Sequence, residues 1–317
     1  QASPTAPWTR LTMGKKAREG ASAGPSQPAP KFGQQLASND KATRDKAVKA
    51  LTKFLKTGCV MEEIELAKIW KALFYCMWHS DKPKVQTDLA QRMGGLVHAV
   101  PGSRATLFAK VFWATMMREW PGIDRLRLNK FYMLLRCMLE NSVRQLRLAN
   151  WPAGGAEAFA QMLWLGPLSP GSPVSLRYWL VDTMLPVLKA ELKTDTAADV
   201  WLALIDPFFR ALGAAPDAHS LKRTTEGVVD ALLAMGEALG EDEAADDGGD
   251  TGDAEAPPGL PIELSRLADR LFVVASDKST REANRQQLYA LQEKVEGLAR
   301  KAGVAAAPPA AATACIP

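Results

Sequence analysis

The sequence predicts an all-α protein of about ten helices, and three observations support this. Apolar residues recur three and four positions apart from residue 31 to about residue 300, as they do on one face of a helix. Helical segments follow one another in pairs with short connections, and no segment has the pattern of a strand bounded by turns. The spacing of the pairs fits the period of about 40 to 47 residues of HEAT and armadillo repeats, so we expect stacked helical hairpins in an α-solenoid. Because the pairs share no repeated motif, a compact globular bundle is the alternative fold.

The composition allows a large core and places opposite charges in different parts of the chain. Of the 317 residues, 47% are hydrophobic, and the net charge is +4. Residues 31–56 carry seven Lys and Arg against two Asp, whereas residues 241–255 carry eight Asp and Glu and no base. The four cysteines follow neither a zinc spacing nor a disulfide framework, which indicates a reducing compartment. The chain has no uninterrupted run of about 18 apolar residues, so no membrane span is predicted.

Composition also suggests how the chain is divided. Residues 1–30 are polar and rich in Pro, Ser, Ala and Gly, with no pattern of a signal peptide, so we expect a disordered N-terminal arm. A helical-repeat domain is expected over 31–240, followed by an acidic linker or loop rich in Gly and Pro over 241–260. A C-terminal helical pair over 261–302 is expected to pack on the repeat domain, and residues 303–317 to form a disordered tail.

The first helices of the repeat domain are amphipathic. Residues 38–58 place apolar side chains on one face and lysines on the other, and Gly58 ends the pattern. The basic residues expected on the solvent face are candidate contacts for RNA phosphates: Lys41, Arg44, Lys46, Lys49, Lys53 and Lys56. A plain solvated face is the alternative. Residues 61–83 begin with acids that suit the positive end of a helix dipole and end at Pro83.

Further helices are expected over 84–100 and 103–120, and the stretch Glu119–Arg136 after them could be a strand or a helix. Its centre alternates like a strand, but about twenty residues without a turn signal exceed ordinary strand lengths. We therefore predict a nearly buried helix whose narrow polar sector holds Arg125 and Arg136 as candidate partner contacts. Arg127 is expected to pair with Asp124 or with an acid on a neighbouring helix, and Lys130 to extend its amine to water.

The pattern continues less regularly beyond residue 150. Helices are predicted near 153–166, 174–192, 196–213, 219–240, 263–276 and 279–301. Pro186 and Pro207 fall inside two of them, and each is expected to kink or break its helix.

The residues that catalysis requires do not assemble in the sequence. The chain contains no phosphate-binding loop, dinucleotide fingerprint, zinc-protease motif or serine nucleophile motif. Cys76 and His79 lie one helical turn apart and could form half of a zinc site, but no second pair follows. The acidic residues cluster in the flexible linker, where positioned acid–base chemistry is impossible. We therefore predict no enzyme activity, no metal and no cofactor.

Most of the nine tryptophans are expected to fill space between stacked helices. Trp78 and Trp120 differ because each lies at a predicted helix end beside a helix breaker. If they are exposed, they would serve as anchors for a partner protein.

Three stretches resemble one protein family: KIWKALFYCMWHSDKP, FWATMMREWPGIDRLRLNKFYMLLRCML and ADRLFVVASDKSTREANRQQLYAL. Together they are similar to the ribosomal RNA-processing protein 1 family, nucleolar factors of large-subunit ribosome assembly. The resemblance runs from about Lys31 to Leu298, and it is loosest between about residues 150 and 215. Many members carry a long tail rich in Lys and Arg, whereas this chain ends in an Ala/Pro segment.

The resemblance implies a non-catalytic helical-repeat scaffold in nucleolar precursors of the large subunit, needed for maturing the ribosomal RNA. Other assembly factors and ribosomal proteins would be its partners, with rRNA contacted through the basic surface. The alternative is a nuclear regulatory adaptor that recruits a phosphatase or a chromatin partner, an activity associated with some family members. A pull-down dominated by chromatin proteins, without assembly factors, would favour that alternative.

Overall fold

The computed structural model describes residues 32–58, 60–192, 196–235 and 262–301. Within these ranges the chain is helical and contains no strand, so the predicted all-α fold is confirmed. The predicted arm at 1–30, acidic linker at 241–260 and tail at 303–317 lie outside the described residues. Among the described helices, none has the length and apolar character needed to cross a bilayer.

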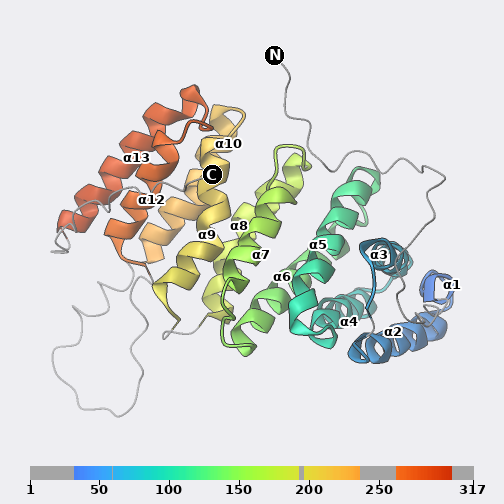
Figure 1. Ribbon diagram of the computed structural model, residues 1–317. Helices are drawn as coiled ribbons and strands as arrows, with labels where there is room; N and C mark the ends of the chain where they lie inside the picture. Colours follow the sequence, from blue (N-terminus) through green and yellow to red (C-terminus); the bar gives the residue numbers. More distant parts are fainter. Residues whose placement is uncertain (1–31, 59, 193–195, 236–261, 302–317) are drawn as a thin grey trace, which may run out of the picture.

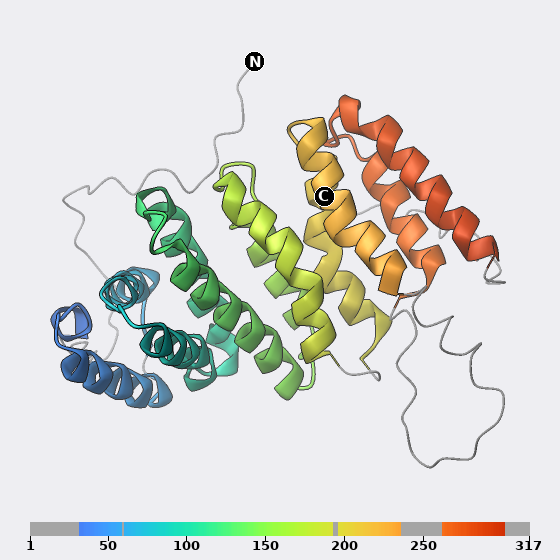
Figure 2. The ribbon, with the colours of Figure 1, turned by 180° about the vertical axis from the view of Figure 1, so that it is seen from behind.

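The helices follow one another along an elongated, curved stack from α1 to α13 (Figures 1 and 2). Their bounds are α1 Phe32–Leu36, α2 Lys41–Lys56, α3 Glu63–Trp78, α4 Pro83–Gly94, η1 Gly95–Ala99, α5 Gly102–Glu119, η2 Trp120–Gly122, α6 Leu128–Leu148, α7 Gly155–Leu165, α8 Val174–Glu191, α9 Ala198–Gly213, α10 Ala218–Thr224, the π-helical η3 Thr225–Asp230, α12 Leu264–Ser276 and α13 Glu282–Lys301.

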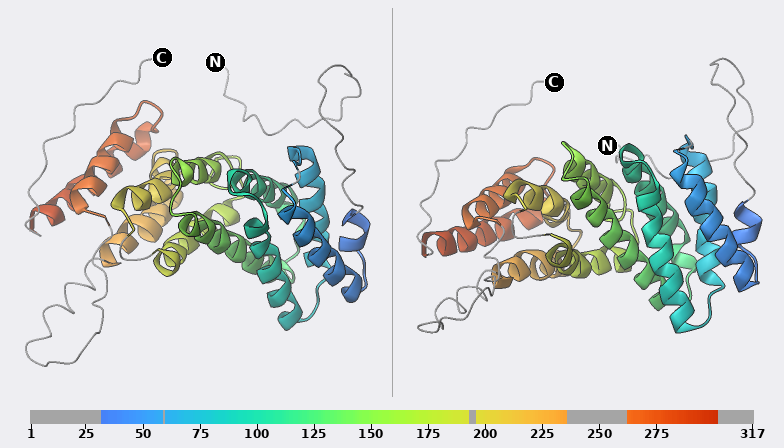
Figure 3. Two further views of the ribbon diagram at one scale, coloured as in Figure 1. Left: turned by 60° about the horizontal axis from the view of Figure 1, so that its bottom comes forward. Right: turned by 90° about the horizontal axis from the view of Figure 1, so that it is seen from below.

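Alternate helices contact each other, which is the arrangement of a two-layered solenoid. α3 contacts α5, α4 contacts α6, α5 contacts α7, α6 contacts α8, and α7 contacts α9. The two layers are visible when the stack is turned about its long direction (Figure 3). Each helix therefore buries its apolar face against the next pair, as the predicted stack of hairpins requires.

Local sequence signals explain where the first helices begin. Asp40 precedes α2, and its carboxylate accepts a hydrogen bond of 2.7 Å from the amide of Thr43. At the start of α3, Glu62 and Glu65 form a capping box in which each side chain accepts from the other's backbone amide. α4 begins at Pro83, whose missing N–H would have no partner in the first turn of a helix.

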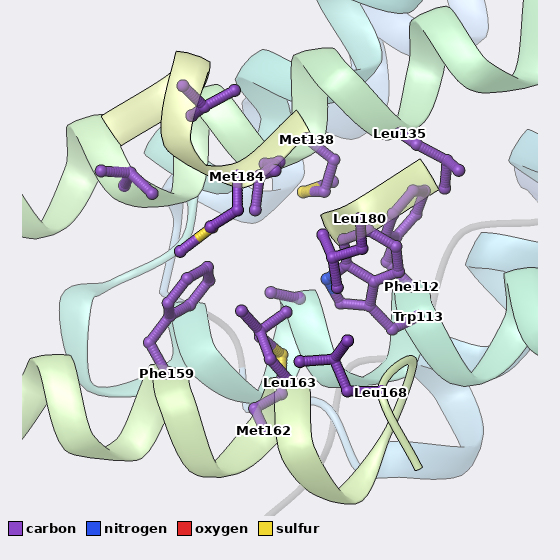
Figure 4. Close-up of a cluster of buried hydrophobic side chains, with 14 of the residues drawn as sticks. Phe112, Trp113, Leu135, Met138, Phe159, Met162, Leu163, Leu168, Leu180 and Met184 are labelled. Carbon is purple, nitrogen blue, oxygen red and sulfur yellow. The ribbon is translucent and has the colours of Figure 1, made fainter. Parts of the chain in front are cut away.

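The core runs along the inside of the stack, and Figure 4 shows its middle section. Phe112 and Trp113 of α5 are buried against side chains of α6, α7 and α8, among them Met138, Phe159 and Leu180. Large aromatic and flexible side chains fill the irregular space between helices that cross at different angles.

The predicted helix over Glu119–Arg136 is wrong in its first half. α5 ends at Glu119, η2 follows, and α6 begins only at Leu128. The residues Ile123–Arg127 instead form a turn, in which Leu126 is 93% exposed. The carboxylate of Asp124 accepts a hydrogen bond from the amide of Arg127, and this local bond competes with helix formation.

Neither interior proline breaks its helix, because α8 continues through Pro186 and α9 through Pro207, and the kinks stay a prediction. A proline leaves the carbonyl group four residues earlier without its helical donor. Pro186 lies on an exposed part of α8, and Pro207 lines an open cavity between α7, α9 and α12. Water can therefore hydrogen-bond to the free carbonyl group at the exposed Pro186, whereas Pro207 is itself buried.

α12 and α13 form a hairpin that packs on the end of α9. The side chain of Asn284 donates hydrogen bonds of 3.0 to 3.2 Å to the carbonyl groups of Leu212, Gly213 and Ala215. Gly213 is also a point of close approach, because a Cβ atom there would lie 2.6 Å from the hydroxyl of Thr280. The division of the chain into separate domains stays a prediction.

Candidate nucleic-acid interface

Four lysines of α2 form a continuous cationic surface, which we call the lysine stripe: Lys46, Lys49, Lys53 and Lys56. All four are exposed, and none has an ion-pair partner among the described residues. The opposite face of α2 carries the buried residues Ala47, Val48, Leu51 and Leu55. Burial of that face fixes the direction of the stripe, which spans ten positions, or about 15 Å along the helix axis.

Lys41 lies at the edge of the stripe and is already paired. Its amine is 2.5 Å from Asp45, and Asp45 also accepts a hydrogen bond of 2.7 Å from Arg92 of α4. Partial burial would raise the pKa of Asp45, but the hydrogen bonds from Lys41 and Arg92 outweigh it and lower this pKa. Lys41 therefore contributes less free positive charge than the four lysines of the stripe.

The expected place of Arg44 on the solvent face is wrong. Arg44 is buried, and its guanidinium donates to the carbonyl groups of Ser38 at 2.8 Å, Asn39 at 2.9 Å and His79 at 3.5 Å. On a helix, Arg44 lies about 200° around the axis from Lys46, so it points toward the core. The N–H groups of the guanidinium therefore satisfy carbonyl groups that the α1–α2 loop and the end of α3 leave unpaired.

The other two candidate cations are exposed but lie away from α2. Arg125 is in the turn before α6, with no ion-pair partner in the part of the chain that the structure describes. Arg136 lies in α6, 3.8 Å from the carboxylate of Glu140. Neither residue joins the lysine stripe on one helix, so any contact with RNA or protein there would be a separate one.

Two further expectations about this region had different outcomes. The predicted ion pair between Arg127 and Asp124 is present. Lys130 does not extend to water: it is buried, and its amine donates hydrogen bonds to the carbonyl groups of Trp78 at 2.7 Å and Ser80 at 2.8 Å. Burial lowers the pKa of Lys130 to about 8, because the charged form loses its hydration.

The two candidate tryptophan anchors also differ. Trp78 is half-buried, and the guanidinium of Arg127 lies over its ring, 4.6 Å from the centroid. Trp120 is buried, and its indole N–H donates a hydrogen bond of 3.0 Å to the hydroxyl of Ser175. Trp120 therefore does not meet the condition of exposure for a partner anchor, because η2 turns the ring inward against Tyr132 of α6.

The described residues contain no group of three His, Cys, Asp or Glu side chains that could hold a metal ion. Burial raises the pKa of the Cys76 thiol to about 11, so this thiol stays protonated at neutral pH. A zinc ion needs the thiolate, which burial makes costly here. The surface chemistry that the geometry does provide is the binding of anions by the lysine stripe.

Sequence reasoning missed the buried roles of Arg44 and Lys130. Both end on carbonyl groups of residues 78–80, at the end of α3. Only the position of Arg44 opposite the lysines could have been read from helical periodicity; Lys130 carried no such signal. These hydrogen bonds form only where α2, α3 and α6 meet, and no local sequence pattern encodes that meeting.

The fold and the lysine stripe define a helical-repeat protein that presents a cationic helix face. Residues 27–292 match the model of a family described as "Nucleolar protein, Nop52". The chain belongs to this family, which agrees with the expected nucleolar localisation and with the resemblance found in the sequence.

Its relatives include proteins from human and from an amoeba. The chain is 34% identical to human ribosomal RNA processing protein 1 homolog A over 84% of this chain and 70% of the relative. It is 34% identical to human homolog B over 86% of this chain and 43% of that relative. The homolog of Dictyostelium discoideum is 26% identical over 82% of this chain and 57% of its own length.

Proposed function

We propose that this protein is a non-catalytic scaffold of the nucleolar large-subunit precursor, that it acts in ribosomal RNA processing, and that it binds rRNA through the lysine stripe. The names of the relatives support the process, since they are ribosomal RNA processing proteins. The observation that carries the RNA contact is the lysine stripe, with its four exposed lysines on one rigid helix. Other assembly factors and ribosomal proteins are its proposed protein partners, bound on the outer faces of the stack.

The stripe suits phosphate groups better than base edges. Lysine amines are compact point charges that contact phosphates without reading the sequence. Each phosphate neutralised releases bound counterions, so the affinity falls as the salt concentration rises. With about 15 Å of helix, the stripe matches a short run of backbone phosphates, and the expected recognition is of shape and charge.

The test is the triple variant Lys46→Glu, Lys49→Glu and Lys53→Glu. We expect it to co-sediment poorly with large-subunit precursors when the salt concentration is raised. With purified precursor RNA, the slope of log affinity against log salt should become shallower by about 2 to 3, because three phosphate contacts are lost. The three lysines have no ion-pair partner among the described residues, so thermal unfolding should show a change in stability within about 0.5 kcal/mol for each substitution.

A matched control separates the stripe from net charge. Lys189→Glu, Lys278→Glu and Lys301→Glu change the charge equally at exposed positions outside α2. The control variant should keep the wild-type salt slope and co-sedimentation. If both triple variants lose the same affinity, or if neither does, RNA contact through the stripe is refuted.

A further inference from the structure

The α3 helix presents a second surface, which differs from the lysine stripe because it combines apolar and cationic side chains. Ile64, Lys68, Lys71 and Tyr75 are spaced four, three and four apart, and so lie within a sector of about 60° on the helix. The two lysines are exposed, Ile64 is 49% exposed and Tyr75 38% exposed. An apolar side chain on an amphipathic helix normally faces the core, whereas these two face away from it.

The turn Ile123–Arg127 extends this surface at the C-terminal end of α3. Trp78 follows Tyr75 by one helical turn, and the guanidinium of Arg127 covers its ring at 4.6 Å. Leu126 stands in this turn and is 93% exposed. We call Ile64, Lys68, Lys71, Tyr75 and Leu126 the α3 surface.

The backbone that presents Leu126 is held in place. The amide of Arg127 donates hydrogen bonds of 3.1 Å to both the carbonyl and the carboxylate of Asp124, and the two side chains form an ion pair. On the other side, the amide of Lys130 donates to the carbonyl of Arg127 at 3.2 Å. Little backbone conformational entropy would therefore be lost when a partner covers Leu126.

The charge of the surface is positive. Lys68 and Lys71 have no ion-pair partner in the described ranges, and the same holds for Arg125 beside Leu126. At the C-terminal end of the surface Asp124 is paired with Arg127 and Asp81 is exposed. At the N-terminal end Glu63 is paired with Lys110, and Glu62 and Glu65 accept hydrogen bonds from backbone amides of the first turn. The α3 surface therefore favours a ligand that carries both apolar groups and negative charges.

We propose that the α3 surface docks an acidic amphipathic segment of a partner protein. Its apolar side chains would cover Leu126, Tyr75 and Ile64, and its carboxylates would pair with Lys68 and Lys71. Burial of exposed aliphatic groups contributes to binding only if the ligand is itself apolar, which excludes the sugar–phosphate backbone. The face of Trp78 that could stack on a base is already occupied by Arg127. The lysine stripe is the better RNA-binding surface, because the exposed residues between its lysines are small or polar.

The experiment uses the full chain in purified nucleolar precursors. The photoreactive amino acid p-benzoylphenylalanine replaces the exposed Asn129, three residues after Leu126. Cross-linked peptides are then identified by mass spectrometry. We expect adducts with a partner protein at a segment whose apolar residues are interleaved with Asp and Glu. Leu126→Ser should reduce their yield about tenfold or more, as loss of one buried leucine contact predicts, and Lys68→Glu with Lys71→Glu should reduce it similarly.

The matched control is Leu148→Ser, which removes another exposed leucine, 67% accessible at the end of α6. It should leave the yield of adducts unchanged. Adducts only with RNA, adducts only with this chain's own residues 241–255 or with a second copy, or no adducts would each overturn the proposal. The triple Glu variant of α2 should keep the protein adducts while it loses RNA, so failure of the RNA proposal is distinguishable from failure of this one.

Discussion

Replacing Lys130 with methionine tests how a buried amine is accommodated at the end of α3. In the wild type, this amine donates to the carbonyl groups of Trp78 and Ser80. Methionine fills a similar volume but donates nothing. Ser80 keeps a donor, because the side chain of Gln86 also binds its carbonyl at 2.9 Å. The main loss is therefore the carbonyl of Trp78, and a buried carbonyl without a donor costs about 1 to 3 kcal/mol.

At pH 7 the amine is charged and its burial is costly, so methionine also removes this cost, and this second effect opposes the loss and depends on pH. Burial lowers the pKa of Lys130 from 10.5 to about 8 in the folded protein. Between these values the unfolded chain binds more protons than the folded chain, so the wild type gains stability as the pH rises. From pH 7 to 9.5 the gain is about 2 kcal/mol, whereas the methionine variant has no such titration. A neutral amine still has two hydrogens to donate, so both hydrogen bonds survive deprotonation.

The two effects nearly cancel at pH 7 and separate at alkaline pH. We therefore expect Lys130→Met to be nearly neutral at pH 7 and destabilising by about 2 kcal/mol more at pH 9.5. Urea unfolding followed by tryptophan fluorescence measures the difference between the variants at each pH. Lys189→Met, at an exposed lysine of α8, is the control and should show no dependence on pH. An equal difference at both pH values would refute the reasoning, because it would mean that Lys130 keeps its ordinary pKa.

Three further predictions test contacts between helices, each by urea unfolding unless another method is given. Gly94→Ala should destabilise the protein by about 2 to 3 kcal/mol, because the new Cβ would lie 2.7 Å from the backbone of Cys137. The control Gly95→Ala should change the stability little, because a Cβ there meets no atom within 4 Å. Asn284→Ala removes three hydrogen bonds to carbonyl groups at the end of α9. A loss of about 2 kcal/mol predicts that amide hydrogen exchange in α12 and α13 becomes about thirtyfold faster or more. Unchanged exchange would show that the hairpin is held by its apolar contacts alone. Glu191→Gln weakens the ion pairs between the buried Glu191 and two partly exposed arginines of α6. This should cost about 1 to 3 kcal/mol, and unaltered stability would show that the pairs are compensated by water.

Most helices could be predicted from the sequence because their signals are local. In α2, the spacing of Ala47, Val48, Leu51 and Leu55 determines the buried face, and that face alone places four lysines in water. Asp40 and Pro83 mark helix starts through chemistry contained in one turn of chain. Helical periodicity is therefore sufficient to predict the lysine stripe.

The errors occurred where side-chain contacts, either local or between distant helices, decide the outcome. Leu126 belongs to an apolar pattern that continues into α6, yet a bond between Asp124 and Arg127 ends the pattern and exposes it. Arg44 and Lys130 are buried because the end of α3 supplies unpaired carbonyl groups, and the sequence does not say which side chains will meet them. A charged residue on an amphipathic segment is therefore the weakest point of a prediction from periodicity alone.

The shared attachment of Arg44 and Lys130 has a geometric consequence. Arg44 belongs to the same helix as the lysine stripe, and Lys130 follows the turn that carries Leu126. Both side chains bind consecutive carbonyl groups, of Trp78, His79 and Ser80. A strand of RNA on α2 and a peptide on α3 would thus be held at one set separation, as if by a spacer, even while later parts of the solenoid bend.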